Sequence, residues 1–191
     1  MERKFSTLSI VIIIVVVLLL DQVTKYSIKI NMQLGESIPV LGDFFRITYV
    51  ENPGMAFGVR IDSPVLFIGL SLFAAGLVFY YLFRLRKDGW ILQIALSFIA
   101  AGAIGNIIDR IIYGRVIDFL DVDFFDITLP AFNFLFINFS GYSITRWYVF
   151  NVADSAVSVG MAFIIFYIIF YGDPLKNSQP EAVHAENNGL K

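Results

Sequence analysis

The chain has 191 residues, of which 58% are hydrophobic and 16% are charged. Its mean hydropathy of +0.74 is well above that of a soluble domain and favours an integral membrane protein. The net charge of -2 gives no sign of a nucleic-acid-binding surface. The sequence has no cysteine, which excludes disulfides and thiolate chemistry, and its one histidine, His184, lies in the polar C-terminal segment. A histidine-based zinc site or a Ser-His pair within the membrane is therefore excluded.

Four apolar stretches approach the ~20 residues that a helix needs to cross a hydrocarbon core of ~30 Å. They predict membrane helices over about 8–29, 65–83, 90–112 and 148–171. The first stretch follows Arg3 and Lys4 but has no small-residue cleavage site after it, so we expect an uncleaved helix. The expected fold is an all-α membrane protein. Residues 1–172 would form one membrane domain, and residues 173–191 a disordered polar tail in the cytoplasm.

Basic residues predict the orientation in the membrane. They lie before the first predicted helix, between the second and third, and after the fourth, at Arg3, Lys4, Arg84, Arg86, Lys87 and Lys176. Cytoplasmic loops are enriched in Lys and Arg, so both termini are expected in the cytoplasm.

Two longer loops would then face outward. Residues 31–64 include the stretch Phe45 to Val50, whose β-branched and aromatic residues predict a small extracytoplasmic β element. Residues 113–147 are rich in aromatic side chains. We interpret them first as an aromatic belt at the membrane interface, and alternatively as a lid over a site.

Ionisable residues near the membrane interior are the strongest functional signal. Such a group costs roughly 3 kcal/mol on insertion scales and is a candidate functional residue by default. A rise of ~1.5 Å per residue puts Asp21, Asn106 and Asp154 in the outer half of the membrane, Asp154 ~9 Å below its surface. Asp118 follows the third helix at the same level. Asp21 and Lys25 are four residues apart and could form an ion pair.

Small and polar residues recur at helical spacing in two further helices. The third helix carries Gly102, Gly105, Asn106, Asp109 and Arg110, and the fourth carries Asn151, Asp154, Ser155 and Ser158. Close helix packing explains the glycines, and hydrogen bonds between helices explain the serines and asparagines. We interpret Asp109 with Arg110 as an ion-paired element that shapes the site.

Two carboxyl groups in one site would suit a pair of one acid and one base. Asp154 is one candidate, but spacing alone does not choose between Asp118 and Asp109 as its partner. Three other acidic residues of the aromatic loop are expected to be solvated: Asp121, Asp123 and Asp126.

Motifs occur in order along these predicted helices and loops. They are Leu-Asp-Gln-Val-Thr-Lys at 20–25, Glu-Asn-Pro-Gly-Met-Ala-Phe-Gly at 51–58, Gly-Ala-Ile-Gly-Asn-Ile-Ile-Asp-Arg at 102–110, Gly-Arg-Val-Ile-Asp-Phe at 114–119 and Phe-Asn-Val-Ala-Asp at 150–154. Together they resemble the lipoprotein signal peptidases, the type II signal peptidases of bacterial cytoplasmic membranes. The resemblance covers nearly the whole chain through the fourth helix.

The resemblance implies an aspartic endopeptidase with its active site at the outer membrane face. Its substrates would be prolipoproteins whose cysteine carries a diacylglyceryl group, cleaved on the N-terminal side of that cysteine. Asp118 and Asp154 would be the catalytic pair. The residues that line or support the pocket would be Asp21, Lys25, Asn52, Gly54, Asn106, Asp109, Arg110 and Asn151. We expect no metal or organic cofactor, contact with membrane lipids, and a monomer.

The chain departs from the family pattern in two places. Pro53 and Met55 alter the second motif, and the segment between Asp118 and Asp154 is longer than usual. Two other functions are compatible with buried polar residues: a small ion- or proton-coupled transporter, and a scaffold whose charges only hold helices together. Transporters usually place their site near the midplane and have repeated halves, and the sequence has neither feature.

Overall fold

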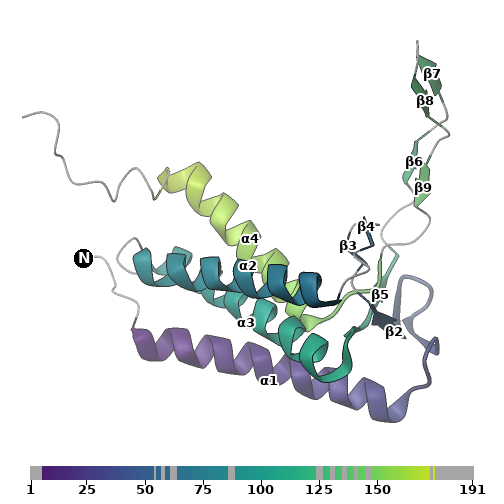
Figure 1. Cartoon of the computed structure of the whole chain (residues 1–191), viewed down its shortest axis with the longest axis horizontal. Helices are drawn as coiled ribbons and strands as arrows, with labels where there is room; N and C mark the ends of the chain where they lie inside the picture. The colour runs from purple at the N-terminus through teal and green to yellow at the C-terminus, as the bar shows by residue number, and fades with distance from the viewer. Residues whose placement is uncertain are drawn as a thin grey trace, which may run out of the picture.

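The computed structural model describes residues 6–53, 55–56, 59–60, 64–85, 89–123, 127–129, 132–134, 137–139, 142–144, 148–172 and 174. In this part of the chain four helices are long and apolar enough to cross a membrane. They are α1 (Thr7–Asn31), α2 (Pro64–Arg84), α3 (Trp90–Tyr113) and α4 (Val152–Tyr171), and they run side by side as an elongated bundle (Figure 1). The predicted four-helix membrane fold is confirmed. Of the predicted tail, only Pro174 lies within the described residues.

Helix α3 is the centre of the bundle because small residues line it. In its apolar window 56% of the residues are buried, compared with 11% in α1 and in α2. A Cβ atom at Gly102 would collide with the carbonyl oxygen of Ala153, and one at Gly160 would lie 2.6 Å from the carbonyl oxygen of Ala95. The backbones of α3 and α4 therefore approach closely, as small residues allow in membrane helices.

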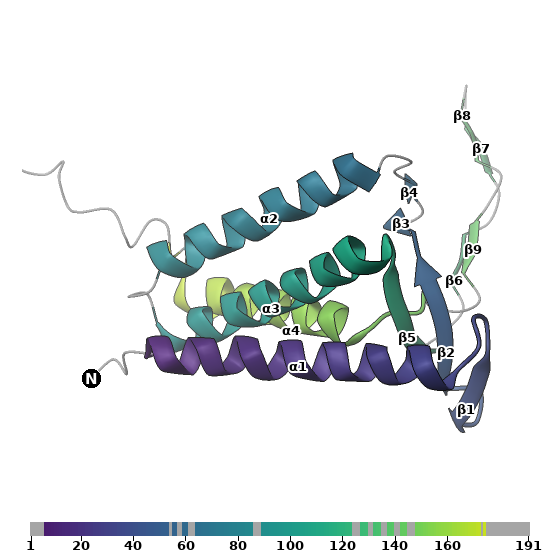
Figure 2. The same cartoon turned by 60° about the horizontal axis from the view of Figure 1, so that its bottom comes forward.

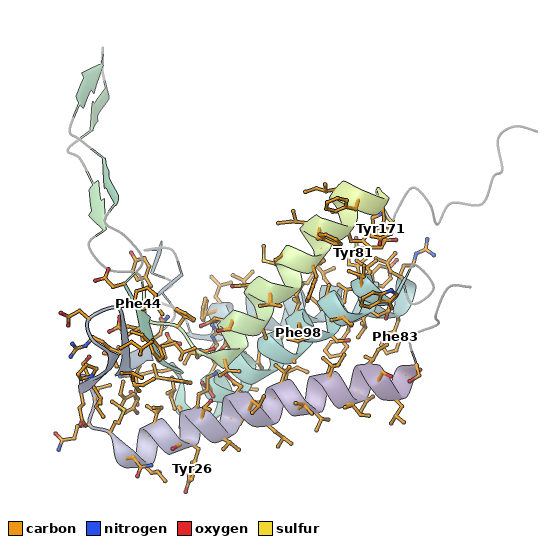
Figure 3. The ribbon with its side chains drawn as sticks, turned by 180° about the vertical axis from the view of Figure 1, so that it is seen from behind. Tyr26, Phe44, Tyr81, Phe83, Phe98 and Tyr171 are labelled. Carbon is orange, nitrogen blue, oxygen red and sulfur yellow. The ribbon has the colours of Figure 1, made fainter. Side chains whose placement is uncertain are left out.

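The outer helices turn apolar side chains away from the bundle. Tyr26 of α1 is 61% exposed and Phe83 of α2 is 67% exposed, and both point outward (Figure 3). Phe98 of α3 instead packs against a buried cluster of Val17, Ala101 and Ala156. Apolar outer faces are expected where lipid takes the place of water around a helix.

A small antiparallel sheet lies at one end of the bundle (Figure 2). Its strands are β1 (Ser37–Leu41), β2 (Phe45–Asn52) and β5 (Val116–Val122), in the order β1-β2-β5. Beside it, β3 (Met55–Ala56) pairs with β4 (Val59–Arg60). The predicted β element is thus confirmed. Strand β5 comes from the second loop, where no strand was predicted, and its buried residues do not alternate with exposed ones.

Helix α3 passes directly into β5. The helix ends at Gly114, whose φ of 69° is a left-handed conformation that glycine adopts without strain. The following strand pairs with β2, with Asp118 opposite Val50. This turn carries Asp118 back to the end of the bundle, beside the polar residues of the helices.

Helix α4 begins at Val152 instead of 148, so the predicted start was wrong. Asn151 has an extended backbone and caps the helix: its side chain accepts the backbone N–H of Asp154, and the Asp154 side chain accepts that of Asn151. Just before it, the backbone of Phe150 pairs with Leu120 of β5. Asp154 therefore lies in the first turn of α4, two residues after its first residue.

Four short strands lie between β5 and α4. Strand β6 (Ile127–Leu129) pairs with β9 (Tyr142–Ile144), and β7 (Phe132–Phe134) pairs with β8 (Ile137–Phe139). These two ladders extend from the sheet end of the bundle, away from the helices (Figure 1).

Candidate active site

Polar side chains from α1, α3, α4 and β5 meet where the bundle joins the sheet. Six of the predicted site residues are buried there: Asp21, Lys25, Asn106, Asp109, Asp118 and Asn151. Asp154 is half-buried beside them. Because buried polar groups need partners, the hydrogen bonds of this cluster indicate how each side chain is held.

Lys25 is the centre of the cluster. Its ammonium group has three N–H donors, and it contacts three oxygens: Asp21 Oδ2 at 2.9 Å, Asp109 Oδ2 at 3.0 Å and Asn106 Oδ1 at 2.9 Å. The predicted pair of Asp21 with Lys25 is confirmed. Two carboxylates and one amide thus compensate for the removal of this cation from water.

The predicted ion pair between Asp109 and Arg110 was wrong. Adjacent residues on a helix point in different directions, so Asp109 turns inward to Lys25 while Arg110 turns toward α2. There the Arg110 guanidinium lies over the ring of Phe67, 4.4 Å from its centre.

The two carboxylates around Lys25 also hold the backbone beside each predicted catalytic aspartate. Asp21 Oδ1 accepts the N–H of Ala153, the residue before Asp154, at 2.9 Å. Asp109 Oδ2 accepts the N–H of Ile117, the residue before Asp118, at 3.1 Å. One buried lysine therefore anchors, through two carboxylates, the segments that carry both aspartates.

Two asparagines contact the aspartate side chains directly. Asn106 Nδ2 donates to Asp154 Oδ1 at 2.8 Å, and Asn151 Nδ2 donates to Asp118 Oδ1 at 2.7 Å. The two amides are joined as well, since Asn151 Nδ2 lies 3.2 Å from Asn106 Oδ1. A continuous path of hydrogen bonds therefore runs from one carboxyl group to the other.

Each of these amides can take only one orientation in the network. Asn106 Oδ1 faces the ammonium of Lys25, which has no acceptor, so its Nδ2 must face Asp154. Asn151 Oδ1 accepts the backbone N–H of Asp154 at 2.9 Å, so its Nδ2 must face Asp118. The carboxyl groups of both aspartates therefore accept N–H groups from these two amides.

The surroundings of Asp118 favour its protonated form. Burial and, next, the nearby charge of Asp154 raise the pKa of Asp118 to about 7, although hydrogen bonds from Asn151 and Asn52 and the charge of Lys25 oppose the rise. Asp118 can therefore hold or release a proton near neutral pH.

A small pocket opens beside this cluster. It is lined by Asn52, Pro53, Phe67, Ile68, Arg110 and Gly114. Asn52 hydrogen-bonds Asp118, so the pocket reaches the carboxyl cluster from the α2 side. A second cavity, of about 410 Å³, lies between α3 and α4. Its apolar lining includes Trp90 of α3 and Phe166 of α4. It contains none of the predicted site residues.

Some sequence predictions about polar residues fail or remain open. Gly54 lies outside the described residues, as does Asp126. Asp121 was expected to be solvated, but it is buried and accepts the hydroxyl of Thr48 at 2.6 Å across the sheet. Ser155 and Ser158 bond to carbonyl groups of the preceding turn instead of to another helix.

Sequence reasoning missed Gln22. Its Nε2 lies 3.2 Å from Asp109 Oδ1 and 3.3 Å from the carbonyl oxygen of Gly105, so it links α1 to α3 next to Lys25. Its position between Asp21 and Lys25 in the first motif was the available signal.

Known proteins resemble this chain in sequence and in fold. Residues 13–170 match the family model described as signal peptidase (SPase) II. The chain is 42% identical over 154 residues to a lipoprotein signal peptidase of Syntrophus aciditrophicus, covering 78% of this chain and 84% of that protein. It is 39% identical over 172 residues to a lipoprotein signal peptidase of Pelotomaculum thermopropionicum, covering 89% and 96%.

Two solved structures described as bacterial membrane enzymes have a similar fold. One has a TM-score of 0.70 and 28% identity, covering 96% of this chain and 99% of the other. The second has a TM-score of 0.69 and 30% identity, covering 90% and 99%. The likeness in fold therefore extends over nearly the whole chain.

Proposed function

The chain belongs to the signal peptidase II family, and we propose that it removes signal peptides from prolipoproteins by aspartic catalysis, with Asp118 and Asp154 as the catalytic pair. The observation that carries the proposal is the hydrogen-bonded path from Asp118 through Asn151 and Asn106 to Asp154. The supporting residues are Asp21, Lys25 and Asp109, which anchor this path. Asn52, Arg110 and Gly54 belong to the proposed pocket.

Two carboxyl groups in one buried site suit hydrolysis of a peptide bond. Mutual repulsion keeps one proton on the pair, and the raised pKa of Asp118 supports this. The ionised carboxylate takes a proton from water, and the resulting hydroxide attacks the scissile carbonyl carbon. The protonated carboxyl polarises the carbonyl oxygen and then helps to protonate the leaving amine as the C–N bond breaks. The two pKa values belong to the pair as a unit.

The asparagines have a positioning role in this mechanism. Asp154 accepts an N–H of Asn106 on Oδ1 and the backbone N–H of Asn151 on Oδ2, and Asp118 accepts an N–H of Asn151 on Oδ1 and a hydrogen bond from Asn52. These donors fix the orientation of both carboxyl groups. Because Lys25 and the α4 cap orient these amides, the carboxyl groups need little rearrangement during the reaction.

The position of the site suits a lipidated substrate. It lies at the end of the bundle, where a signal-peptide helix would present its scissile bond while the diacylglyceryl chains stay in lipid. We place the sheet at the outer face and both termini in the cytoplasm of a bacterial cell. The basic residue Arg84 lies at the opposite end of α2 from the sheet and is consistent with this orientation.

Purified protein in detergent tests the catalytic pair. We expect Asp118→Asn and Asp154→Asn each to reduce cleavage of a diacylglyceryl-modified prolipoprotein by at least 1,000-fold, in the range typical of losing a catalytic group. Products are identified by mass, which also locates the cleaved bond relative to the lipidated cysteine.

Asp121→Asn is the matched control, because Asp121 is a buried aspartate on the same strand. Asparagine at this position still offers an oxygen to Thr48, so activity should remain near that of the parent. Near-normal cleavage by either catalytic variant would contradict the aspartic mechanism. Failure of the parent to cleave the lipidated substrate would favour a transporter or scaffold function.

A further inference from the structure

Gln22 lies beside the two carboxylates that share Lys25, and the proposed mechanism gives it no role. Its Nε2 has three oxygens within 3.3 Å: Asp21 Oδ2 at 3.1 Å, Asp109 Oδ1 at 3.2 Å and the carbonyl oxygen of Gly105 at 3.3 Å. All three oxygens are acceptors, and a glutamine amide donates only through its nitrogen. The orientation of the Gln22 amide is therefore fixed, and its two N–H groups are shared among these acceptors.

The carboxylate of Asp109 depends on this donor. Asp109 is only 1% exposed, so water has little access to it. Its Oδ2 accepts from Lys25 and from the backbone N–H of Ile117. Within the described part of the chain, the donor to its Oδ1 is Gln22. A buried oxygen that loses its donor is costly, so the Asp109 side chain should move if the amide is removed.

Asp21 accepts from the same nitrogen. Asp21 is fully buried, and its Oδ2 accepts from Lys25 at 2.9 Å as well as from Gln22. A Cβ atom at Gly105 would lie 2.5 Å from this oxygen, so the glycine allows the carboxylate to lie against α3. Gln22 thus bridges two buried carboxylates from different helices, which Lys25 also joins.

Each of these carboxylates holds the backbone next to one proposed catalytic residue. Asp109 accepts the N–H of Ile117, directly before the proposed catalytic aspartate of β5. Asp21 accepts the N–H of Ala153, directly before the proposed catalytic aspartate of α4. Because the amide of Gln22 contacts both carboxylates, it helps to set the distance between these two backbone segments.

We propose that Gln22 is a positioning residue for the catalytic pair, because its amide bridges Asp21 and Asp109 and so fixes β5 relative to the start of α4. This role rests on the proposed function. Lys25 supplies the positive charge of the cluster, whereas Gln22 supplies donors without changing the charge. Loss of the amide should therefore lower kcat by displacing the two catalytic carboxyl groups. KM should change little, since Gln22 does not line the pocket beside Asn52.

Gln22→Met tests the bridge, because methionine has a similar length but no N–H donor. With a diacylglyceryl-modified prolipoprotein as substrate in detergent, we expect kcat to fall at least about tenfold and KM to stay within about twofold of the parent. Gln93→Met is the matched control. Gln93 is a buried glutamine near the start of α3, at the other end of the bundle, where its Nε2 donates to the carbonyl oxygen of Leu85 at 2.6 Å. The control should lose thermal stability but keep the kcat of the folded parent.

Gln22→Glu adds a pH dependence that a merely structural role would not produce. The new carboxyl group donates one hydrogen bond when it is protonated and none when it is ionised. The charged groups on α1 and on the elements packed against it at this level are Asp21 and Lys25 on α1, Asp109 and Arg110 on α3, Asp154 on α4 and Asp118 on β5. Ionisation would add a further carboxylate to this cluster. Activity relative to the parent at the same pH should therefore be at least about fivefold higher at pH 5.5 than at pH 8.

Hydrogen exchange measures the same bridge without a substrate. In Gln22→Met the backbone amides of Ile117 and Ala153 should exchange at least about fivefold faster than in the parent, because the carboxylates that accept them are less firmly held. Gln93→Met should leave both exchange rates unchanged.

A parent-like kcat in Gln22→Met, or an equal loss in Gln93→Met, would overturn the proposal. A relative activity of Gln22→Glu that does not change with pH would overturn it as well. If Gln22→Met does not fold, the pH dependence of Gln22→Glu decides instead. If the parent does not cleave the substrate, the proposed function fails, and exchange then decides the bridge: faster exchange at Ile117 and Ala153 keeps it, and unchanged rates overturn it.

Discussion

At the scale of residues, the candidate site depends on one buried lysine. Lys25 neutralises part of the charge of Asp21 and Asp109 and orients Asn106, so its effect reaches both proposed catalytic aspartates through hydrogen bonds. Removal of one member of a buried ionic group leaves uncompensated charge and is usually strongly destabilising. The cluster therefore has both a stabilising and a positioning role.

The raised pKa of Asp118 gives a prediction about stability and pH. Asp118 has a folded-state pKa of about 7, above its ordinary value, so the native state binds more protons than the unfolded state between about pH 4 and 7. This carboxyl therefore makes a contribution to stability that decreases as pH rises through that range. At pH 8 the native parent buries an ionised Asp118, whereas the side chain of Asp118→Asn stays neutral, so we expect the variant to be more stable than the parent at pH 8, by up to about 4 kcal/mol.

Thermal unfolding in detergent at pH 5 and at pH 8 measures this effect. The stability difference between Asp118→Asn and the parent should be larger at pH 8. A difference independent of pH would argue that Asp118 is already ionised at pH 5. Asp121→Asn, on the same strand, provides the comparison for a buried aspartate outside the proposed pair.

At the scale of elements, close contact between α3 and α4 places Asn106 within reach of Asp154. Gly102 permits this contact, since a side chain there would meet the Ala153 carbonyl and, at 2.8 Å, Val157 Cγ2. Strand β5 completes the arrangement by returning Asp118 to Asn151. The proposed catalytic pair is thus brought together by helix packing and strand pairing.

Substitution of a single glycine tests this packing. Gly102→Ala should separate α3 from α4 and lower the free energy of unfolding by about 1–3 kcal/mol, the usual cost of overpacking. Activity should also fall, because Asp154 directly follows Ala153. Gly76→Ala on α2 is the control: no atom lies within 4 Å of the added Cβ, so it should be neutral or slightly stabilising. Equal effects of the two variants on thermal unfolding and cleavage would refute the role of close packing.

At the scale of the whole molecule, the helix bundle and the sheet occupy different parts of the structure. The helices turn apolar faces outward, whereas the three-stranded sheet lies at one end of the bundle (Figure 2). The first residues of α1 and the last residues of α4 lie at the other end (Figure 1). The candidate site lies between these two parts, which suits the proposed hydrolysis of a lipidated substrate.

The proposed orientation can be measured with the cysteine-free chain. Asp43→Cys, at the sheet end, should react with a membrane-impermeant maleimide in intact bacterial spheroplasts. Thr7→Cys, at the start of α1, should react only after the membrane is opened. The reverse pattern would place the sheet, and with it the candidate site, on the cytoplasmic side.

The sequence by itself determined the local features of this protein. Long apolar stretches define the four helices because membrane insertion depends mainly on the composition of about 20 consecutive residues. The i, i+4 spacing identified the pair of Asp21 and Lys25, since both partners lie on one helix. Family motifs also singled out Asp118 and Asp154 as a pair.

Only the tertiary structure decided which residues are partners across elements. Asp109 bonds to Lys25 instead of pairing with Arg110, and Asp121 is buried against Thr48, because helix and strand packing bring them there. The start of α4 likewise depends on Phe150, which is held by β5. Such contacts join residues far apart in the chain, and local pattern contains no information about them. The hydrogen-bonded path between Asp118 and Asp154 is of this kind, so it exists only in the folded molecule.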